Sequence, residues 1–246
     1  MQESIDNVDQ CSRGFAASRV NADRYDYFVD DPFESHGIAL QNMPRGGRLL
    51  DVGCGSGGFV SGARDRLGCH VVGIEPHAQR ALDARNRGIE VYQSMLTPEL
   101  LAQLGSFDVI TFLDVLEHVP DPVSLLQLAK SALNKNGIVI VSVPNIAHWT
   151  VRLKLLFGKF EYEPTGIMDA THLRWFTKKT LAQVHDEAGL KIVNYDVSRG
   201  TWMPFYSTRP ILRHLSKERR RKLINRLCMK MPTLFGAQHV CVSRVA

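Results

Sequence analysis

The sequence predicts one α/β domain in which a doubly wound, mostly parallel sheet carries helices on both faces. Its 246 residues suit a single domain of this class, since a chain of roughly 200–250 residues buries a sufficient core by itself. Short apolar runs alternate with helical stretches over residues 48–145, the pattern of successive strand, helix and strand units. A glycine-rich turn joins the first apolar run to the first helical stretch.

Seven runs of strand length are expected in the sheet. They cover residues 48–52, 69–75, 89–93, 107–113, 137–143, 191–197 and 238–245. The fifth run is nearly all β-branched, as in a strand that is buried on both faces, and Pro144 ends it. We therefore expect a mostly parallel seven-stranded sheet with an antiparallel strand at its C-terminal end.

Helical stretches separate the first five runs and precede the sixth. They are expected at residues 57–66, 77–87, from Thr97 onward, 122–135 and 177–189. Thr97 and Asp121 each stand directly before a proline, and a capping side chain followed by proline is typical of a helix start. Thr177 is a capping residue as well. Each of these three positions is predicted to begin a helix.

The composition limits the class of protein. Hydrophobic residues make up 44% of the chain and charged residues 22%, the balance of a folded rather than a disordered protein. The five cysteines are widely spaced and no zinc-type spacing is present, so neither a disulfide framework nor a metal is expected. No run has the length of a signal-peptide core or a membrane span. The cytoplasm is therefore the expected location.

The formal net charge of +5 is concentrated near the C-terminal end. Residues 209–230 contain nine lysines or arginines and one acid, which leaves −3 for the rest of the chain. A nucleic-acid partner is therefore not expected. Apolar residues between the charges predict an amphipathic helical insert. Its charges either form a solvated face or contact an anionic surface, such as a membrane, a carrier protein or a phosphorylated acceptor.

The glycine-rich turn is the first candidate ligand site. Gly53, Gly55 and Gly57 follow Asp51 between the first expected strand and helix, and glycine permits positive φ and a close approach of the backbone to a ligand. Gly53, Gly55 and Gly58 also satisfy the G-x-G-x-x-G pattern of dinucleotide sites. The carboxylate of Asp51 argues against a pyrophosphate, because the like charges would repel, and favours a cationic moiety.

Glu75 ends the second expected strand, 18 residues after Gly57. An acid at this point can accept hydrogen bonds from both ribose hydroxyls of a nucleoside. The alternative is a surface acid at a strand end. Because the ribose role suits several nucleoside cofactors equally, Glu75 indicates a nucleoside without identifying it.

The run FDVITFLDVLEHV, residues 107–119, continues from the fourth strand into the loop that follows it. With the glycine loop and Glu75, it makes residues 33–200 resemble the class I S-adenosylmethionine-dependent methyltransferases, a Rossmann-like family. The similarity is closest to the ubiquinone-pathway O-methyltransferases and the MetW-like proteins.

That resemblance implies S-adenosyl-L-methionine as cofactor. It assigns the methionine moiety to Asp51, Gly53, Gly55 and Gly57, the ribose to Glu75, and the adenine to Ser94, Met95 and Leu113. Gln93 and Ser94 stand where the family often has an aspartate, so the adenine contact departs from the family pattern.

Residues 145–176 follow the fifth strand, at the edge of the sheet that also carries the glycine loop. In related methyltransferases this region covers the acceptor, and its mixture of rings and polar groups is typical of a small-molecule pocket. The candidate substrate-binding residues are Asn145, Trp149, Tyr162, Asp169 and Arg174. Alternatively, Asp169, His172 and Arg174 form an internal tether that fixes the helix after them.

Three histidines on loops after expected strand ends are candidate general bases: His118, His148 and His172. An imidazole with an ordinary pKa near 6.5 is suited to take a proton from an acceptor hydroxyl at neutral pH. We favour His148 and His172, because both lie in the covering segment, whereas His118 could pack against the cofactor.

Residues 33–36 are expected to form a flap over the cofactor, although His36 could simply be a polar residue at a helix start.

The chain therefore divides into an N-terminal extension, residues 1–32, and a methyltransferase domain, residues 33–246. The expected activity is methyl transfer from S-adenosylmethionine to an oxygen of a small-molecule or sugar-like acceptor. An NAD-dependent oxidoreductase is the alternative among enzymes. From a different class, a MetW-like chain would bind S-adenosylmethionine or a partner enzyme and regulate it without turnover.

Overall fold

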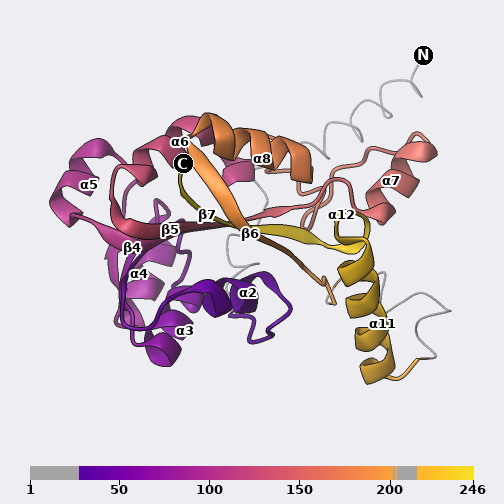
Figure 1. The fold of residues 1–246 in the computed structure, drawn as a ribbon, viewed down its shortest axis with the longest axis horizontal. Coiled ribbons are helices and arrows are strands. Elements are labelled where there is room, and N and C mark those ends of the chain that lie inside the picture. The colour runs from indigo at the N-terminus through magenta and orange to yellow at the C-terminus, as the bar shows by residue number, and fades with distance from the viewer. Residues whose placement is uncertain (1–27, 202, 204–214) are drawn as a thin grey trace, which may run out of the picture.

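The computed structural model describes residues 28–201, 203 and 215–246, and Figure 1 shows a central sheet between two layers of helices. Most of the expected N-terminal extension, residues 1–27, and the start of the expected basic insert, residues 209–214, lie outside the described residues. Within the described part of the chain, no helix is long and apolar enough to cross a membrane.

The sheet has seven strands, in the spatial order β3-β2-β1-β4-β5-β7-β6. The strands are β1 Arg48–Val52, β2 His70–Ile74, β3 Glu90–Tyr92, β4 Phe107–Leu113, β5 Leu133–Pro144, β6 Leu190–Ser198 and β7 Gln238–Val245. β7 runs antiparallel to both of its neighbours, and the other described pairs are parallel. The expected mostly parallel sheet with a C-terminal antiparallel strand is confirmed.

Helices cover both faces of this sheet. They are α2 Ser35–Asn42, α3 Gly58–Leu67, α4 Ala78–Asn86, α5 Pro98–Leu104, the 3-10 helix η3 Leu116–His118, α6 Pro122–Lys130, α7 Trp149–Leu156, α8 Lys178–Glu187, α11 Lys217–Lys230 and α12 Pro232–Phe235. In Figure 1, α2, α3 and α4 lie on one side of the sheet, and α5, α6 and α8 on the other. α7 and α11 extend from one end of the molecule.

The central strands supply both hydrophobic cores, because successive side chains of a strand point to opposite faces. In β4, Ile110 and Phe112 join the core under α5, α6 and α8, whereas Val109 joins the core under α2, α3 and α4. β5 alternates in the same way, with Val139 in the first core and Ile140 in the second. This two-sided burial explains why the fifth strand is so rich in β-branched residues.

One expected boundary is wrong. The helix predicted to reach residue 135 ends at Lys130, and β5 begins at Leu133. Leu133 pairs with Phe107 of β4 ahead of a register shift, and the Asn134 side chain donates a 2.6 Å hydrogen bond to Asp108. Residues 133–136 therefore join the sheet. They make contacts with β4 that would be lost if the preceding helix continued to residue 135.

The start of α8 shows how a local signal fixes a helix end. Thr177 Oγ1 accepts a hydrogen bond from the Thr180 amide at 3.2 Å, and Thr180 Oγ1 accepts one from the Thr177 amide at 2.9 Å. This reciprocal arrangement satisfies two amides that have no partner inside the helix. It confirms Thr177 as the residue that begins α8.

We expect Thr177→Ala to lower the free energy of unfolding by about 1 kcal/mol, because the cap oxygen is lost. Urea unfolding followed by circular dichroism measures the change. Thr177→Ser keeps the oxygen and should restore most of the stability. An alanine variant as stable as the parent protein would show that the cap is energetically neutral.

Candidate active site

A cavity of about 580 Å³ opens at the carboxyl ends of the parallel strands, where the strand order reverses between β1 and β4. Ligands of open α/β sheets bind in the crevice at this point. The residues that line it include Asp51, Gly53, Gly55, Glu75, Ser94, Met95 and Leu113. The structure therefore brings together all the expected cofactor residues except Gly57, which precedes α3 and faces Ala84 instead.

The glycine loop depends on backbone conformations that other residues rarely adopt. Gly53 has φ of 77°, and a Cβ atom placed on it would lie 2.7 Å from the Val115 side chain. The amides of Gly53 and Cys54 both donate to the carbonyl of Ile74, at 2.7 and 3.1 Å. A larger residue at position 53 would strain the loop and push it from the strand that holds it.

Asp51 lies at the end of β1 and is buried. Its carboxylate accepts a 2.6 Å hydrogen bond from the Thr111 hydroxyl of β4. Burial, with the nearby charge of Glu75, raises the pKa of Asp51 to about 7, although the hydrogen bond from Thr111 acts in the opposite direction. A ligand cation placed beside Asp51 would offset both effects, because an opposite charge favours the ionised carboxylate.

Glu75 is held in a fixed orientation by the backbone. Its two carboxylate oxygens accept hydrogen bonds from the Gly55 amide at 3.0 Å and from the His77 amide at 2.8 Å. A carboxylate has about four acceptor positions, so Glu75 can still accept bonds from two hydroxyl groups. These contacts favour the ribose role over that of a surface acid, since the side chain is only 4% exposed.

At the other end of the cavity, Glu117, His118 and His172 form a cluster. One ligand atom from each side chain lies within 4.8 Å of the others, and the two imidazole rings are 4.9 Å apart. Neither carboxylate oxygen of Glu117 has a hydrogen-bond partner, although the side chain is buried. Burial, with the nearby charge of Asp114, raises the pKa of Glu117 well above its usual range. Such a cluster can share a proton or hold a cation.

The covering segment holds this cluster in place. The carbonyl of Glu117 accepts hydrogen bonds from the amides of Leu173 and Arg174, at 2.8 and 3.3 Å. The Arg174 guanidinium contacts the carbonyls of Val119 and Pro120. Asp169 is buried and accepts from the amide and hydroxyl of Thr171. Arg174 and Asp169 thus make internal contacts of the kind that the tether alternative expects, and neither residue lines the cavity.

Four other residues of this segment also lie outside the cavity lining. The Asn145 side chain donates to carbonyls next to α12, Trp149 begins α7, and Tyr162 packs against Phe160 and Trp175. His148 is fully buried at the start of α7, and burial lowers its pKa to about 4. The inner surface is formed instead by Gly166, Ile167, Thr171 and His172.

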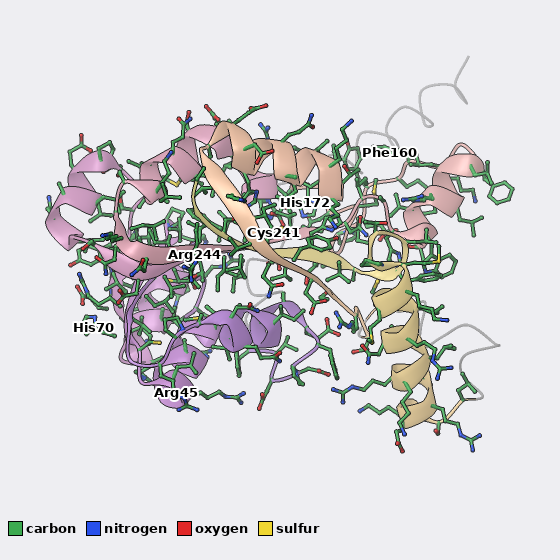
Figure 2. All side chains as sticks on the ribbon, in the orientation of Figure 1. Arg45, His70, Phe160, His172, Cys241 and Arg244 are labelled. Atoms are coloured by element: carbon green, nitrogen blue, oxygen red, sulfur yellow. The ribbon has the colours of Figure 1, made fainter. Side chains whose placement is uncertain are left out.

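Figure 2 shows His172 close to the sheet and Phe160 farther out, on the side of the molecule where α7 lies. Residues 145–176 present one outer and one inner side, because the chain first runs outward along α7 and then comes back to line the cavity. Of the three candidate bases, His118 and His172 therefore face the cavity and each other. The preference for His148 is not supported by its position.

The expected flap contributes to the lining of the cavity. Glu34 and His36 line the cavity, and the Glu34 carboxylate accepts from the amides of Gly200 and Thr201 at 3.2 and 3.0 Å. The guanidinium groups of Arg199 and Arg221 lie over the ring of Phe33, 5.4 and 5.3 Å from its centre. The segment is thus fixed to residues that follow β6 and to α11.

Sequence reasoning left out several residues of the cavity. Asp114 is the one non-glycine residue of positive φ in the described ranges, at 56°, and Gln238 donates to both of its carboxylate oxygens. The position of Asp114 and Glu117 directly after β4 was a usable signal, because strand ends border the crevice. Gln238 carried no such signal, since it comes from the start of an antiparallel strand.

Comparisons with known proteins bear on this geometry. A family model for the methyltransferase domain matches residues 23–195. The ubiquinone biosynthesis O-methyltransferase of Aeromonas salmonicida is 32% identical over 182 residues, which cover 71% of each chain. The enzyme of the same name from Colwellia psychrerythraea is 32% identical over 155 residues, 60% of this chain and 62% of that one.

Solved structures of low identity share the fold. An S-adenosylmethionine-dependent methyltransferase from Archaeoglobus fulgidus aligns with a TM-score of 0.55 and 18% identity, covering 84% of this chain and 88% of its own. A possible histamine N-methyltransferase from Thermotoga maritima aligns with a TM-score of 0.55 and 19% identity, over 97% and 96%.

We expect Glu75→Ala to weaken S-adenosylmethionine binding by about 2 to 3 kcal/mol, because two charge-assisted hydrogen bonds are lost and water replaces part of each. Calorimetry on the folded variant measures the affinity. Glu90→Ala, which removes an exposed acid of β3, is the matched control and should bind as the parent protein does. If the affinity of Glu75→Ala is unchanged, Glu75 does not bind the ribose and is only an acid at a strand end.

Binding should also depend on pH through Asp51. Its pKa is about 7 in the ligand-free protein, and a bound cation lowers it, so binding releases a proton and weakens as the pH falls through about 7. The expected loss approaches about tenfold per pH unit below that value. Calorimetry in two buffers of different ionisation enthalpy detects the proton. Asp51→Asn should bind weakly without this dependence, and a flat profile in the parent protein would contradict the assignment.

Proposed function

The chain belongs to the class I S-adenosylmethionine-dependent methyltransferases, and from this premise we propose that it methylates an oxygen of a small-molecule acceptor. One observation carries the proposal. A single cavity joins the buried carboxylates of Asp51 and Glu75 to the cluster of Glu117, His118 and His172. A cofactor held at the first end would present its methyl group toward the second.

The residues at the first end suit the parts of the cofactor. Asp51 would face the ammonium group of the methionine moiety, and Glu75 would accept both ribose hydroxyls. Ser94, Met95 and Leu113 also line the cavity and would contact the adenine. The cofactor supplies an activated methyl group on a sulfonium. The protein contributes mainly by holding donor and acceptor in line, which can account for most of the acceleration of such a transfer.

The residues at the second end suit a hydroxyl acceptor. His118 or His172 would take the proton of the attacking hydroxyl. The Nδ1 atoms of these residues lie 3.2 Å from the carbonyls of Thr171 and Ile167 respectively. Such contacts orient an imidazole, because a ring nitrogen that donates to a carbonyl fixes which nitrogen is the acceptor. An imidazolium beside Glu117 would lower the raised pKa of this carboxyl, and the ionised carboxylate would stabilise the cation.

The lining also bears on the class of acceptor. Val115, Val119, Leu125 and Ile167 line the same cavity as the polar cluster, so a hydroxyl carried on an apolar skeleton suits it better than a sugar. The two relatives named above are both called ubiquinone biosynthesis O-methyltransferases. Their names support oxygen as the methylated atom and a small molecule as its carrier.

The two alternatives are not favoured. A dinucleotide would place its pyrophosphate next to Asp51, whose charge would repel it. A regulator without turnover would have no use for an unpaired carboxylate and two imidazoles at the acceptor end of the cavity.

Turnover distinguishes the enzyme from the regulator. The purified chain is incubated with S-adenosylmethionine and hydroxylated aromatic acceptors, and the demethylated cofactor and a product heavier by one methyl group are measured. Binding without turnover on any acceptor would favour the regulator.

The histidines allow a direct test of the acceptor end. We expect His118→Gln or His172→Gln, whichever removes the base, to lower kcat by roughly 10² to 10⁴ while the affinity for S-adenosylmethionine stays unchanged. His148→Gln should leave kcat near the parental value, because His148 lies outside the cavity, and should lower the free energy of unfolding by about 1 kcal/mol through loss of a cap.

Steady-state kinetics and urea unfolding on the three variants separate these effects. A stable His148→Gln variant with a large loss of kcat would overturn the assignment of the acceptor end. Full activity in both cavity variants would mean that positioning alone accounts for the reaction.

A further inference from the structure

The end of α7 and the loop after it expose an unusual number of large apolar side chains. We call this group the apolar tip; its members are Leu153, Leu155, Leu156, Phe157 and Phe160. Leu156 and Phe157 are 77% and 71% exposed. Isolated exposed apolar residues are common, but a contiguous group of this kind marks a surface that contacts another apolar phase.

A cationic surface lies on α11. This helix carries seven lysines or arginines and one acid between Lys217 and Lys230. Arg221 pairs with Asp31, which shortly precedes the flap, and Lys222 pairs with Glu218. Arg219, Arg226 and Lys230 are exposed and form no ion pair with any residue that the structure describes. We call these three residues the cationic face.

The apolar tip and the cationic face belong to one end of the molecule. Figure 1 shows α7 and α11 at that end with α12 between them. The side chain of Asn145, just before α7, donates to the carbonyls of Thr233 and Gly236 at the two ends of α12. Met203 packs both against the small core under α7 and against the one that buries Ile224 of α11.

We propose that this end of the protein docks on the surface of an anionic lipid membrane. Cations that remain in the headgroup region next to apolar side chains that enter the acyl boundary are the combination by which proteins bind such an interface. An acidic protein partner would pair with the cations but would leave the projecting leucines and phenylalanines without a defined role. A second copy of the chain would bring two cationic faces together.

The geometry agrees with this orientation. The same segment that exposes Phe157 and Phe160 presents Ile167 and His172 to the cavity on its inner side. A docked molecule would therefore hold the acceptor end of the cavity behind a wall that contacts the lipid. The proposal concerns the surface alone and does not depend on which acceptor is methylated.

Sedimentation with vesicles tests the apolar tip. The full chain should bind vesicles of phosphatidylglycerol and phosphatidylcholine more tightly than vesicles of phosphatidylcholine alone, and more weakly as salt is added. Leu156→Ser with Phe157→Ser should lower the partition coefficient by about tenfold or more. Leu82→Ser with Val193→Ser removes two exposed apolar residues elsewhere and should not lower it.

The cationic face has its own variant and control. Changing Arg219, Arg226 and Lys230 to Gln should weaken binding to the anionic vesicles on the order of a hundredfold at low salt and reduce the salt dependence. The control changes Arg45, Lys135 and Arg244, which surround a groove at the opposite edge of the sheet, to Gln. It alters the net charge equally and should bind nearly as the parent protein does.

Three results would overturn the proposal. The first is a parent protein that does not bind anionic vesicles at low salt, and the second is equal loss in the cationic-face variant and its control. The third is a dimer, found by light scattering, that disappears in the apolar-tip variant. All variants should retain the parental affinity for S-adenosylmethionine, so a failure of docking is distinguishable from a failure of the active site.

Discussion

The parallel pairing of β1 with β4 is the constraint on which the active site depends. At this pair the order of strands reverses, so the chain leaves β1 toward one face of the sheet and β4 toward the other. The glycine loop and η3 are therefore held apart across one crevice. The hydrogen bond from Thr111 to Asp51 joins the two strands at its floor. A shift of either strand by one residue would turn its side chain to the opposite face of the sheet and break this hydrogen bond.

Buried carboxylates give the crevice its chemical character. Asp51 and Glu117 are buried, and each has a raised pKa, chiefly because burial disfavours the charged form of the carboxyl. A protein that keeps such groups away from water retains a free-energy cost that a suitable ligand can offset. A cation at the end that holds Asp51 and a hydrogen-bond donor at Glu117 would each offset part of this cost, whereas a pyrophosphate beside Asp51 would add to it.

The parts of the site that follow from local sequence were predictable. The glycine loop and Glu75 sit at strand ends whose positions the apolar runs indicate, and the structure places them together. The covering segment was less predictable, because no period in residues 145–176 shows which side chains face inward. His148 is adjacent to the chain's exit from β5 yet faces away from the cavity, because it caps α7. The long-range contact of Gln238 with Asp114 depends on antiparallel pairing that local patterns do not reveal.

The position of Phe33 has a thermodynamic consequence. The guanidinium groups of Arg199 and Arg221 lie over its ring, and Arg221 also pairs with Asp31, so the wall of the cofactor cavity and helix α11 share one set of contacts. An anion that drew Arg221 away from Asp31 would remove one of these contacts, and by reciprocity a ligand that favours the present arrangement of the wall would weaken the anion's hold on Arg221. The cofactor and such an anion would then bind as coupled equilibria.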